Sequence, residues 1–259
     1  MKVVSFITLS CLLLTCSLFA ERRAADLSEG PIIKVLLAKD ANSVLLEAKG
    51  AYRVVRKDTG SFLGFGLSGK RFVCHALEEG LRWGEEFPDV YQITVLPQGP
   101  EATMSVDGIQ YKGAISIYQA KEGRISVVNE VPIEDYLKST LSLFYKTPLP
   151  KEAMAALVIA ARTDAYAKVS QNRPWDVEVK KAGYYGVGVT QQKNKVKESI
   201  DWTRHMVVRS TKSGKLISGV TIPPGAAEEL AERGSDARKI ISSVVPDAKL
   251  TLPSEVRFR

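Results

Sequence analysis

An unbroken apolar run constrains this fold more than any other feature of the sequence. All nine residues from Ala153 to Ala161 are apolar, so a helix over them has no face suited to solvent and must be surrounded by the rest of the domain. Pro150 suits the first helical position, and Glu152 suits the first turn, where a carboxylate meets unpaired backbone N–H groups. The sequence therefore predicts a central buried helix that starts near Pro150 and ends near Ser170.

A charged residue, Arg162, follows the apolar run directly and precedes Thr163 and Asp164. A guanidinium on an otherwise apolar helix needs an acidic partner, because an unpaired buried charge is strongly unfavourable. The nearest acidic pair upstream in the sequence is Glu134 and Asp135. We expect one of these two carboxylates to meet Arg162 across the fold. A structural ion pair beneath a buried helix is the simpler interpretation, and a functional site is the alternative.

The first twenty residues have the pattern of an export signal. A basic start precedes an apolar run that ends at Ala20, before Glu21, which predicts a signal peptide over residues 1–20. Residues 21–30 are polar and are predicted to be a flexible lead-in. The apolar run is also near the lower length limit for a membrane span, so an uncleaved anchor and lipidation at Cys16 stay open. Membrane contact is expected only in those two cases.

Composition points to an ordinary ordered domain with a mild positive charge. Apolar residues make up 45% of the chain and charged residues 25%, which is typical of a globular protein. Signal cleavage would leave Cys74 as the remaining thiol, so no disulfide is expected. It would also lower the formal net charge from +7 to +6. Outside the cytoplasm this favours wall polymers or anionic lipid headgroups as partners, and no basic run interleaved with aromatic residues indicates nucleic-acid binding.

Short strands dominate the first half. Alternating patterns and turn residues predict them at residues 32–37, 43–48, 52–56, 70–75, 91–96, 103–106, 109–118 and 124–128. Asp107 and Gly108 suit a two-residue hairpin turn. Gly64, Gly66 and Gly69 have the spacing of a dinucleotide-binding loop, but such a loop must open a helix and a strand is predicted to follow. We therefore expect no cofactor.

The second half mixes helices and strands. Strands are predicted at residues 175–179, 206–210 and 215–221, an amphipathic segment at 191–201, and helices at 226–233 and 236–244. Together these patterns predict an α+β fold with a β-rich N-terminal half, a central buried helix, further strands and C-terminal helices. We expect a β-rich part over residues 31–124 and a helical and mixed core over residues 125–250.

Carboxylates are the main candidates for chemistry. With His75 and His205 as its two histidines, the sequence has no spaced metal motif, so no metal site is expected. It also lacks a phosphate-binding loop and a nucleophile-elbow serine. Glu134, Asp135 and Glu152 lie close to the buried helix in sequence. Cleavage of a glycosidic bond requires at least one carboxyl group that can protonate the leaving oxygen.

Three motifs point to a known family. They are Tyr111-Lys112-Gly113, the stretch VNEVPIEDYL at residues 128–137, and a helix that begins PKEAM at Pro150 and ends Ala-Ala-Arg-Thr at Thr163. They resemble the Tyr-Arg-Gly, VNELPLEDYL and Ala-Ala-Arg-Thr elements of the family of stage II sporulation protein D and the amidase enhancer LytB. The resemblance runs through the mature chain, and a final Gly-Ala segment at residues 225–241 is similar as well.

This resemblance implies an exported envelope protein that acts on peptidoglycan glycan strands, since the sporulation members are lytic transglycosylases of peptide-free strands. It implies Arg162, Thr163 and Tyr185 as substrate-binding residues. An N-acetylmuramoyl-L-alanine amidase is a further partner that it suggests. The aromatic residues that could either stack on sugar rings or fill the core are Trp175, Tyr184, Tyr185 and Trp202.

The chain departs from the family at the position that matters most for catalysis. Counting from the Glu-Asp-Tyr motif, the catalytic glutamate of the family falls at Phe144, and no carboxylate occurs between Tyr136 and Lys151. A catalytically degenerate protein that binds glycan strands or a wall hydrolase is therefore expected. One alternative is an active lytic transglycosylase with a displaced catalytic carboxylate. Another is a non-enzymatic amidase enhancer. The candidate catalytic carboxylates are Glu134, Asp135 and Glu152.

Overall fold

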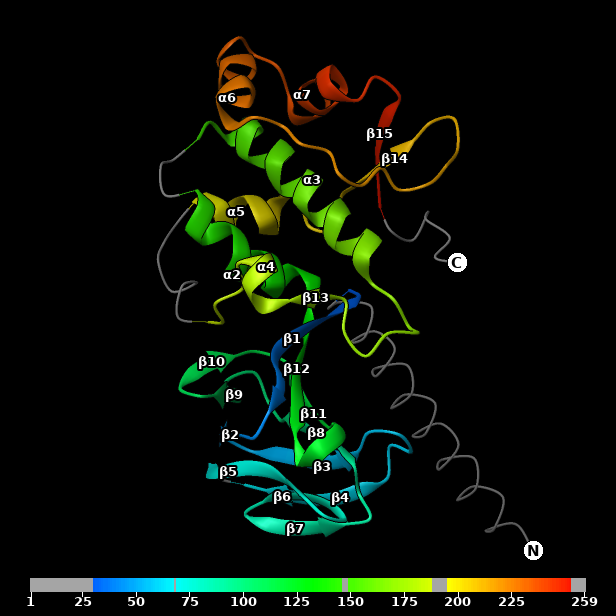
Figure 1. Cartoon of the computed structure of the whole chain (residues 1–259). Coiled ribbons are helices and arrows are strands. Elements are labelled where there is room, and N and C mark those ends of the chain that lie inside the picture. Colours follow the sequence, from blue (N-terminus) through cyan, green and yellow to red (C-terminus); the bar gives the residue numbers. More distant parts are fainter. Residues whose placement is uncertain (1–29, 68, 146–148, 188–194, 253–259) are drawn as a thin grey trace, which may run out of the picture. The chain divides into compact units, whose positions relative to one another are not determined.

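The computed structural model describes residues 30–67, 69–145, 149–187 and 195–252. The predicted signal peptide and residues 21–29 of the predicted lead-in lie outside them. Ile32–Arg259 forms one compact unit (Figure 1). Its buried apolar core runs from Ile33 to Ile241, so this unit contains the residues that stabilise it.

The predicted β-rich half is confirmed, and it consists of two sheets. Within the described ranges, the first sheet has seven strands in the order β13 (Val177–Glu178), β1 (Ile32–Ala41), β12 (Ile125–Pro132), β11 (Ala114–Gln119), β8 (Gln92–Pro97), β3 (Tyr52–Arg56) and β4 (Phe62–Gly66). The second has six, in the order β10 (Ile109–Tyr111), β9 (Thr103–Val106), β2 (Ser43–Lys49), β5 (Lys70–Leu77), β6 (Gly80–Trp83) and β7 (Glu85–Pro88). β13 pairs with β1 in parallel, and the other pairs are antiparallel.

The two sheets share one core. Tyr52 from the first sheet and Trp83 from the second make an edge-on ring contact with centroids 5.4 Å apart, and Trp83 Nε1 donates to the Leu46 carbonyl at 3.0 Å. β1 and β2 are separated by a single residue yet belong to different sheets. A strand that switches sheets in this way closes a corner between the two layers.

The predicted hairpin turn is confirmed. Val106 pairs with Ile109, and the two residues between them, Asp107 and Gly108, have φ values of 48° and 86°. A two-residue turn with two positive φ angles matches the twist of its strands. The strand predicted over residues 109–118 is divided into β10 and β11 at Lys112 and Gly113.

The central buried helix is also confirmed. α3 spans Lys151–Lys168 with Pro150 as its N-cap, one residue later than predicted. The remaining elements are α2 (Ile133–Phe144), α4 (Val179–Ala182), α5 (Lys195–Trp202), α6 (Pro224–Glu232), α7 (Ala237–Val244), the short η1 (Lys121–Gly123), β14 (Val207–Ser210) and β15 (Ala248–Thr251). α3 packs against α2, α5, α6, α7 and β14 (Figure 1), which surrounds its apolar run as the sequence requires.

Two predicted strands are confirmed only in part. Of residues 175–179, Val177 and Glu178 alone pair with β1, and α4 begins at Val179. In residues 215–221, Leu216 forms an isolated antiparallel bridge with Arg209 of β14, and the backbone then turns at Gly219, which has a φ of 75°. β14 also pairs with β15. The Gly219 N–H instead donates to Asp164 Oδ1 at 2.5 Å. No helix in the described part of the chain is both long and apolar enough to span a membrane.

Candidate functional site

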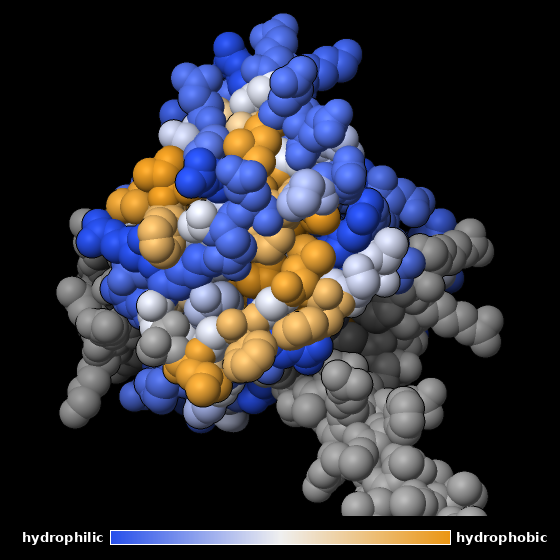
Figure 2. Space-filling model, turned by 90° about the horizontal axis from the view of Figure 1, so that it is seen from below, coloured by the Kyte–Doolittle hydropathy of each residue, from blue (hydrophilic) through white to orange (hydrophobic). Residues whose placement is uncertain are grey.

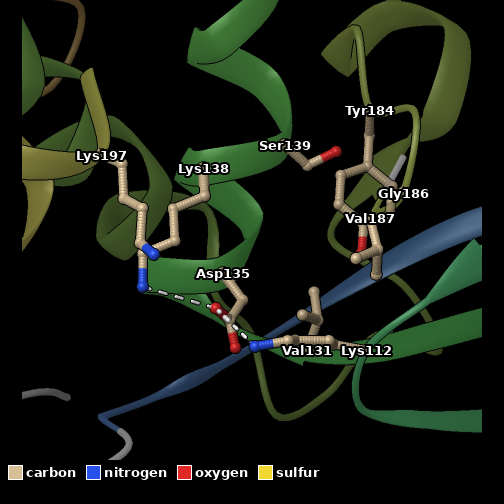
Figure 3. A pocket seen from close by; sticks show the side chains of 9 residues that line it. All are labelled: Lys112, Val131, Asp135, Lys138, Ser139, Tyr184, Gly186, Val187 and Lys197. Atoms are coloured by element: carbon tan, nitrogen blue, oxygen red, sulfur yellow. Dashed lines mark ion pairs between the residues drawn. The ribbon is translucent and has the colours of Figure 1, made fainter. Parts of the chain in front are cut away.

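A cavity of about 130 Å³ lies where the start of α2 meets the turn between β10 and β11 and the loop after α4 (Figure 3). Its lining residues are Lys112, Val131, Asp135, Lys138, Ser139, Tyr184, Gly186, Val187 and Lys197. Pockets that enclose a whole small ligand are usually larger, roughly 300–1,000 Å³. The cavity is therefore suited to one substituent of a larger ligand.

Positive charge exceeds negative charge in the cavity lining. Lys112, Lys138 and Lys197 face the single carboxylate of Asp135 (Figure 3). Asp135 Oδ1 lies 3.7 Å from Lys112 Nζ and 3.6 Å from Lys138 Nζ. Lys138 Nζ also lies 3.2 Å from Asp201 Oδ1 at the surface of α5. These ion pairs are long and partly exposed, so an incoming anion can compete with Asp135 for the lysines.

Backbone contacts fix the loop that forms one wall of the cavity. The Val187 N–H donates to the Gln110 carbonyl at 2.7 Å. Gly186 has a φ of 72°, and a Cβ there would overlap that same carbonyl oxygen. The Tyr185 N–H donates to Ser139 Oγ at 3.2 Å, while the Tyr185 side chain is 54% exposed. The residue between the lining residues Tyr184 and Gly186 therefore carries an accessible phenol ring.

A column of three tyrosines supports the cavity from beneath. The Tyr184 ring stacks between Tyr111 and Tyr136 with centroids 5.6 Å from each, and its hydroxyl donates to Asn129 Oδ1 at 2.6 Å. Burial raises the pKa of Tyr184 well above its ordinary value and the pKa values of Tyr111 and Tyr136 to about 12. These hydroxyls stay protonated at neutral pH, and that of Tyr184 is used in its bond to Asn129.

The motif residues Tyr111, Lys112 and Gly113 each have a separate part in this arrangement. Tyr111 belongs to the ring column, Lys112 pairs with Asp135, and Gly113 lies against β12. Gly113 has a φ of 79°, and a Cβ would overlap the Glu130 carbonyl oxygen. Only glycine combines this φ with so close an approach. The motif therefore positions a lysine at the cavity.

The predicted ion pair of Arg162 is confirmed, and Glu134 is its partner. Arg162 Nε and Nη2 donate to the two carboxylate oxygens of Glu134 at 2.8 and 2.9 Å. Nη2 also donates to the Ile200 carbonyl at 3.0 Å, and Nη1 to Thr203 Oγ1 and the Met206 carbonyl at 3.2 and 3.3 Å. Arg162 is 0% and Glu134 5% exposed. A ligand would reach Arg162 only by displacing one of these partners.

His205 connects the buried pair to the surface. Its Nδ1 lies 3.8 Å from Glu134 Oε1, and its backbone N–H donates to the same oxygen at 3.4 Å. Burial lowers the pKa of His205 below its ordinary value, partly opposed by the Glu134 carboxylate. The imidazole is therefore neutral at pH 7. No group of three or more potential metal ligands occurs among the residues that the structure describes.

The other predicted site residues have separate positions. Thr163 Oγ1 donates to the Ile159 carbonyl at 2.7 Å and accepts from the Val208 N–H at 2.9 Å, which ties α3 to β14. Glu152 lies in the first turn of α3 and accepts from the Ala237 N–H at the start of α7 at 2.9 Å. Of the three candidate catalytic carboxylates, Asp135 is the one that lines the cavity. The catalytic and substrate-binding roles of all these residues stay predictions.

Sequence reasoning missed the lysines of the cavity and the role of Asn129. Lys138 lies one helical turn after Asp135. A predicted helix over this segment would have indicated that the two side chains form a pair. Among the four aromatic residues left open, Tyr184 belongs to the core and Tyr185 and Trp202 are exposed. Trp175 lines a second, more open cavity of about 410 Å³ beside α4, together with Lys168, Arg173 and Lys181.

Residues 121–209 match the family described as stage II sporulation protein (SpoIID). The chain belongs to this family. The matched segment contains α2 and α3 and every residue of the cavity lining except Lys112. Membership in the SpoIID family relates the function of the chain to the cell wall. The resemblance indicated by the sequence motifs is thereby confirmed.

Similar chains occur in other bacteria. An uncharacterized protein of Chlamydia pneumoniae is 39% identical over 220 residues, which cover 84% of this chain and 80% of the relative. One of Chlamydia muridarum is 38% identical over 225 residues, covering 86% and 78% of the two chains. One of Brachyspira hyodysenteriae is 26% identical over 190 residues, or 72% of this chain and 50% of the relative. No solved structure matches the chain.

Proposed function

We propose that this SpoIID-family chain is an exported cell-envelope protein that binds peptidoglycan glycan strands and does not cleave them. The observation that carries the proposal is Phe144 at the end of α2, the position where the family resemblance expects the catalytic glutamate. The sequence offers no carboxylate from Tyr136 to Lys151 to take its place. Without a carboxyl group that can protonate the leaving oxygen, a glycosidic bond is not cleaved at a useful rate.

The contacts of the neighbouring carboxylates support the loss of catalysis. Glu134 accepts from Nε and Nη2 of Arg162, and Glu152 accepts from the backbone N–H of Ala237 at the start of α7. A general acid needs a proton and a path to the substrate. Glu134 is buried in its ion pair with Arg162, and Glu152 accepts a hydrogen bond from the N-terminus of α7. Neither carboxylate is therefore positioned to protonate a substrate.

The cavity supports the binding half of the proposal. It combines three lysines, a serine hydroxyl and the neighbouring exposed ring of Tyr185. Polar groups of this kind can bond sugar hydroxyls and acidic substituents, and an aromatic face can pack on a sugar ring. Its small volume suits one substituent of a glycan strand that extends across the surface. Peptidoglycan strands carry such substituents at regular intervals.

The test uses protein that begins at Glu21, since the core lies within Ile33–Ile241. Binding to peptide-free glycan strands is measured by co-sedimentation, and the same mixtures are searched for anhydromuramyl products. We expect binding without products. The double variant Lys112→Gln/Lys138→Gln should bind about tenfold more weakly, because two charge-assisted contacts are lost. Lys239→Gln, an exposed lysine on α7, is the matched control. Efficient turnover by the natural chain would overturn the proposal.

One observation favours a second candidate function, a lytic transglycosylase with a displaced acid. Asp135 lines the cavity, unlike Glu134 and Glu152. If Asp135 supplied the proton, Asp135→Asn would abolish turnover while the Lys239→Gln control kept it. Turnover that survives in Asp135→Asn would exclude this candidate. Introducing an acid at the family position, Phe144→Glu, gives the complementary test, because a binding scaffold that has lost its acid is expected to gain activity.

A further inference from the structure

Large hydrophobic side chains are exposed together on the segment that joins the two sheets at β4 and β5. Phe62 is 56%, Phe65 66%, Leu67 82% and Phe72 51% exposed, and these four residues form the β4–β5 patch. The rings of Phe62 and Phe65 lie 6.4 Å apart. Figure 2 shows hydrophobic residues grouped across one face of the molecule and bordered by hydrophilic ones. Exposed apolar patches of this kind are usually interaction sites.

The pairing of β4 with β3 shows that the exposed phenylalanine of β4 lies on the face of the sheet away from the core. Phe65 pairs with Arg53, while Gly64 and Gly66 pair with Val54 and Tyr52. Paired residues lie on the same face of a sheet, so β4 presents glycine to the core beside the buried Val54 and Tyr52 and presents phenylalanine to solvent. Gly66 leaves room for the Tyr52 ring, which a Cβ there would overlap, but the solvent face of a strand ordinarily carries polar residues rather than phenylalanine. The aromatic residues are therefore placed for an external contact.

Basic side chains accompany the β4–β5 patch. The guanidinium of Arg53 lies 5.8 Å from the Phe62 ring centroid, and Lys70 Nζ lies 5.9 Å from that of Phe72. Between Asp58 and Glu78 the sequence contains no acidic residue but includes Lys70 and Arg71. Lys70 is paired with Glu85. Among the described residues, Arg53 and Arg71 form no ion pair within 4 Å, although Arg71 faces Glu47 across the strands.

We propose that the β4–β5 patch docks the protein onto an anionic lipid bilayer. Phe62, Phe65, Leu67 and Phe72 would enter the boundary between headgroups and acyl chains, and Arg53 and Arg71 would meet the headgroup phosphates. Aromatic and leucine side chains flanked by arginine and lysine are typical of surfaces that lie on a membrane. The lack of acidic residues between Asp58 and Glu78, together with Arg53 beside the exposed Phe62 ring, gives the patch a positive charge that matches an anionic bilayer surface.

The test measures co-sedimentation of the protein beginning at Glu21 with vesicles of phosphatidylcholine alone or mixed with phosphatidylglycerol. We expect binding that requires phosphatidylglycerol and weakens as salt is added. Phe65→Ser/Leu67→Ser should weaken vesicle binding at least about tenfold, because two apolar side chains that would be buried in the bilayer are lost. Val244→Ser/Leu252→Ser removes two exposed hydrophobic residues elsewhere and should leave binding unchanged. Arg53→Gln/Arg71→Gln should weaken binding and reduce its dependence on salt.

Three results would overturn the proposal. The first is no binding to the phosphatidylglycerol vesicles. The second is equal binding by the Phe65→Ser/Leu67→Ser variant, with its thermal unfolding unchanged. The third is a dimer in solution that the same variant abolishes in the absence of vesicle binding, because the occupant of the β4–β5 patch would then be a second copy of the chain.

Discussion

Replacing Arg162 with methionine should destabilise this protein more than any surface substitution. Arg162→Met leaves the buried carboxylate of Glu134 without its bidentate partner, while the contact of Glu134 with His205 stays in place. It also removes the donors to the Ile200 and Met206 carbonyls. Methionine preserves most of the apolar volume of the side chain, so the loss reports the charge and hydrogen bonds rather than a cavity.

The magnitude follows from the near-complete burial of both groups. Breaking a buried ion pair by removing one partner costs about 3–5 kcal/mol. For a domain of this size, 1 kcal/mol corresponds to roughly 2–4 °C in Tm, so Arg162→Met should lower the Tm by about 6–20 °C. Glu134→Leu should cost a similar amount. Replacing both residues should cost less than the sum of the two single changes by at least about 2 kcal/mol, because no unpaired charge remains.

The assay is urea unfolding, monitored by circular dichroism, of the natural chain, the two single variants and the double variant. Asp135→Asn is the matched control, because its ion pairs are 3.6 and 3.7 Å long and partly exposed, and such pairs contribute less than about 1 kcal/mol. Two results would refute the reasoning: free-energy losses that add within error, or an Arg162→Met variant no less stable than the Asp135→Asn control.

Three further predictions concern single residues. His205→Asn keeps a residue that tolerates the φ of 64° and removes a group whose pKa burial lowers. The stability that this group contributes is complete above its ordinary pKa of 6.5 and is lost as pH falls through the lowered pKa of the folded state. The free energy of unfolding should therefore depend less on pH in the variant than in the natural chain between about pH 7 and 5. Equal slopes of this free energy against pH would contradict the prediction. Gly113→Ala should lower the stability several times more than Gly60→Ala. Both glycines have positive φ, but of the two only Gly113 has a backbone carbonyl where the new Cβ would lie. Equal shifts in Tm would exclude this overlap. Tyr184→Phe should cost about 1–3 kcal/mol in urea unfolding by leaving the Asn129 acceptor without its donor, and an unchanged midpoint would show that this bond is dispensable.

The parts of the fold that the sequence predicts are those that local patterns determine. Nine consecutive apolar residues require a surrounded helix, and Arg162 at its end requires a carboxylate, so both α3 and its ion pair could be anticipated. Asp107 and Gly108 tolerate positive φ and predict their hairpin for the same local reason. In each case the information lies within a few residues of the feature.

The parts that failed depend on contacts between distant residues. The predicted strand at residues 215–221 alternates acceptably, but it contributes one bridge to β14, and the strand that pairs along β14 is β15, which comes about thirty residues later. The cavity brings together Lys112, Asp135 and Lys197 from three separate elements, and no periodicity links them. Glu152 bonds Ala237 across 85 residues. Such contacts are determined by tertiary packing.

The burial of the apolar stretch of α3 has a consequence for the order in which the chain folds during synthesis. The two-sheet half is complete once residue 132 has emerged, apart from the short edge strand β13. α3 follows soon after, but the helices that cover it, α6 and α7, lie at residues 224–244. For that interval a nascent chain exposes apolar residues of α3 that the folded protein buries, so fragments ending before residue 224 are expected to aggregate or to recruit chaperones.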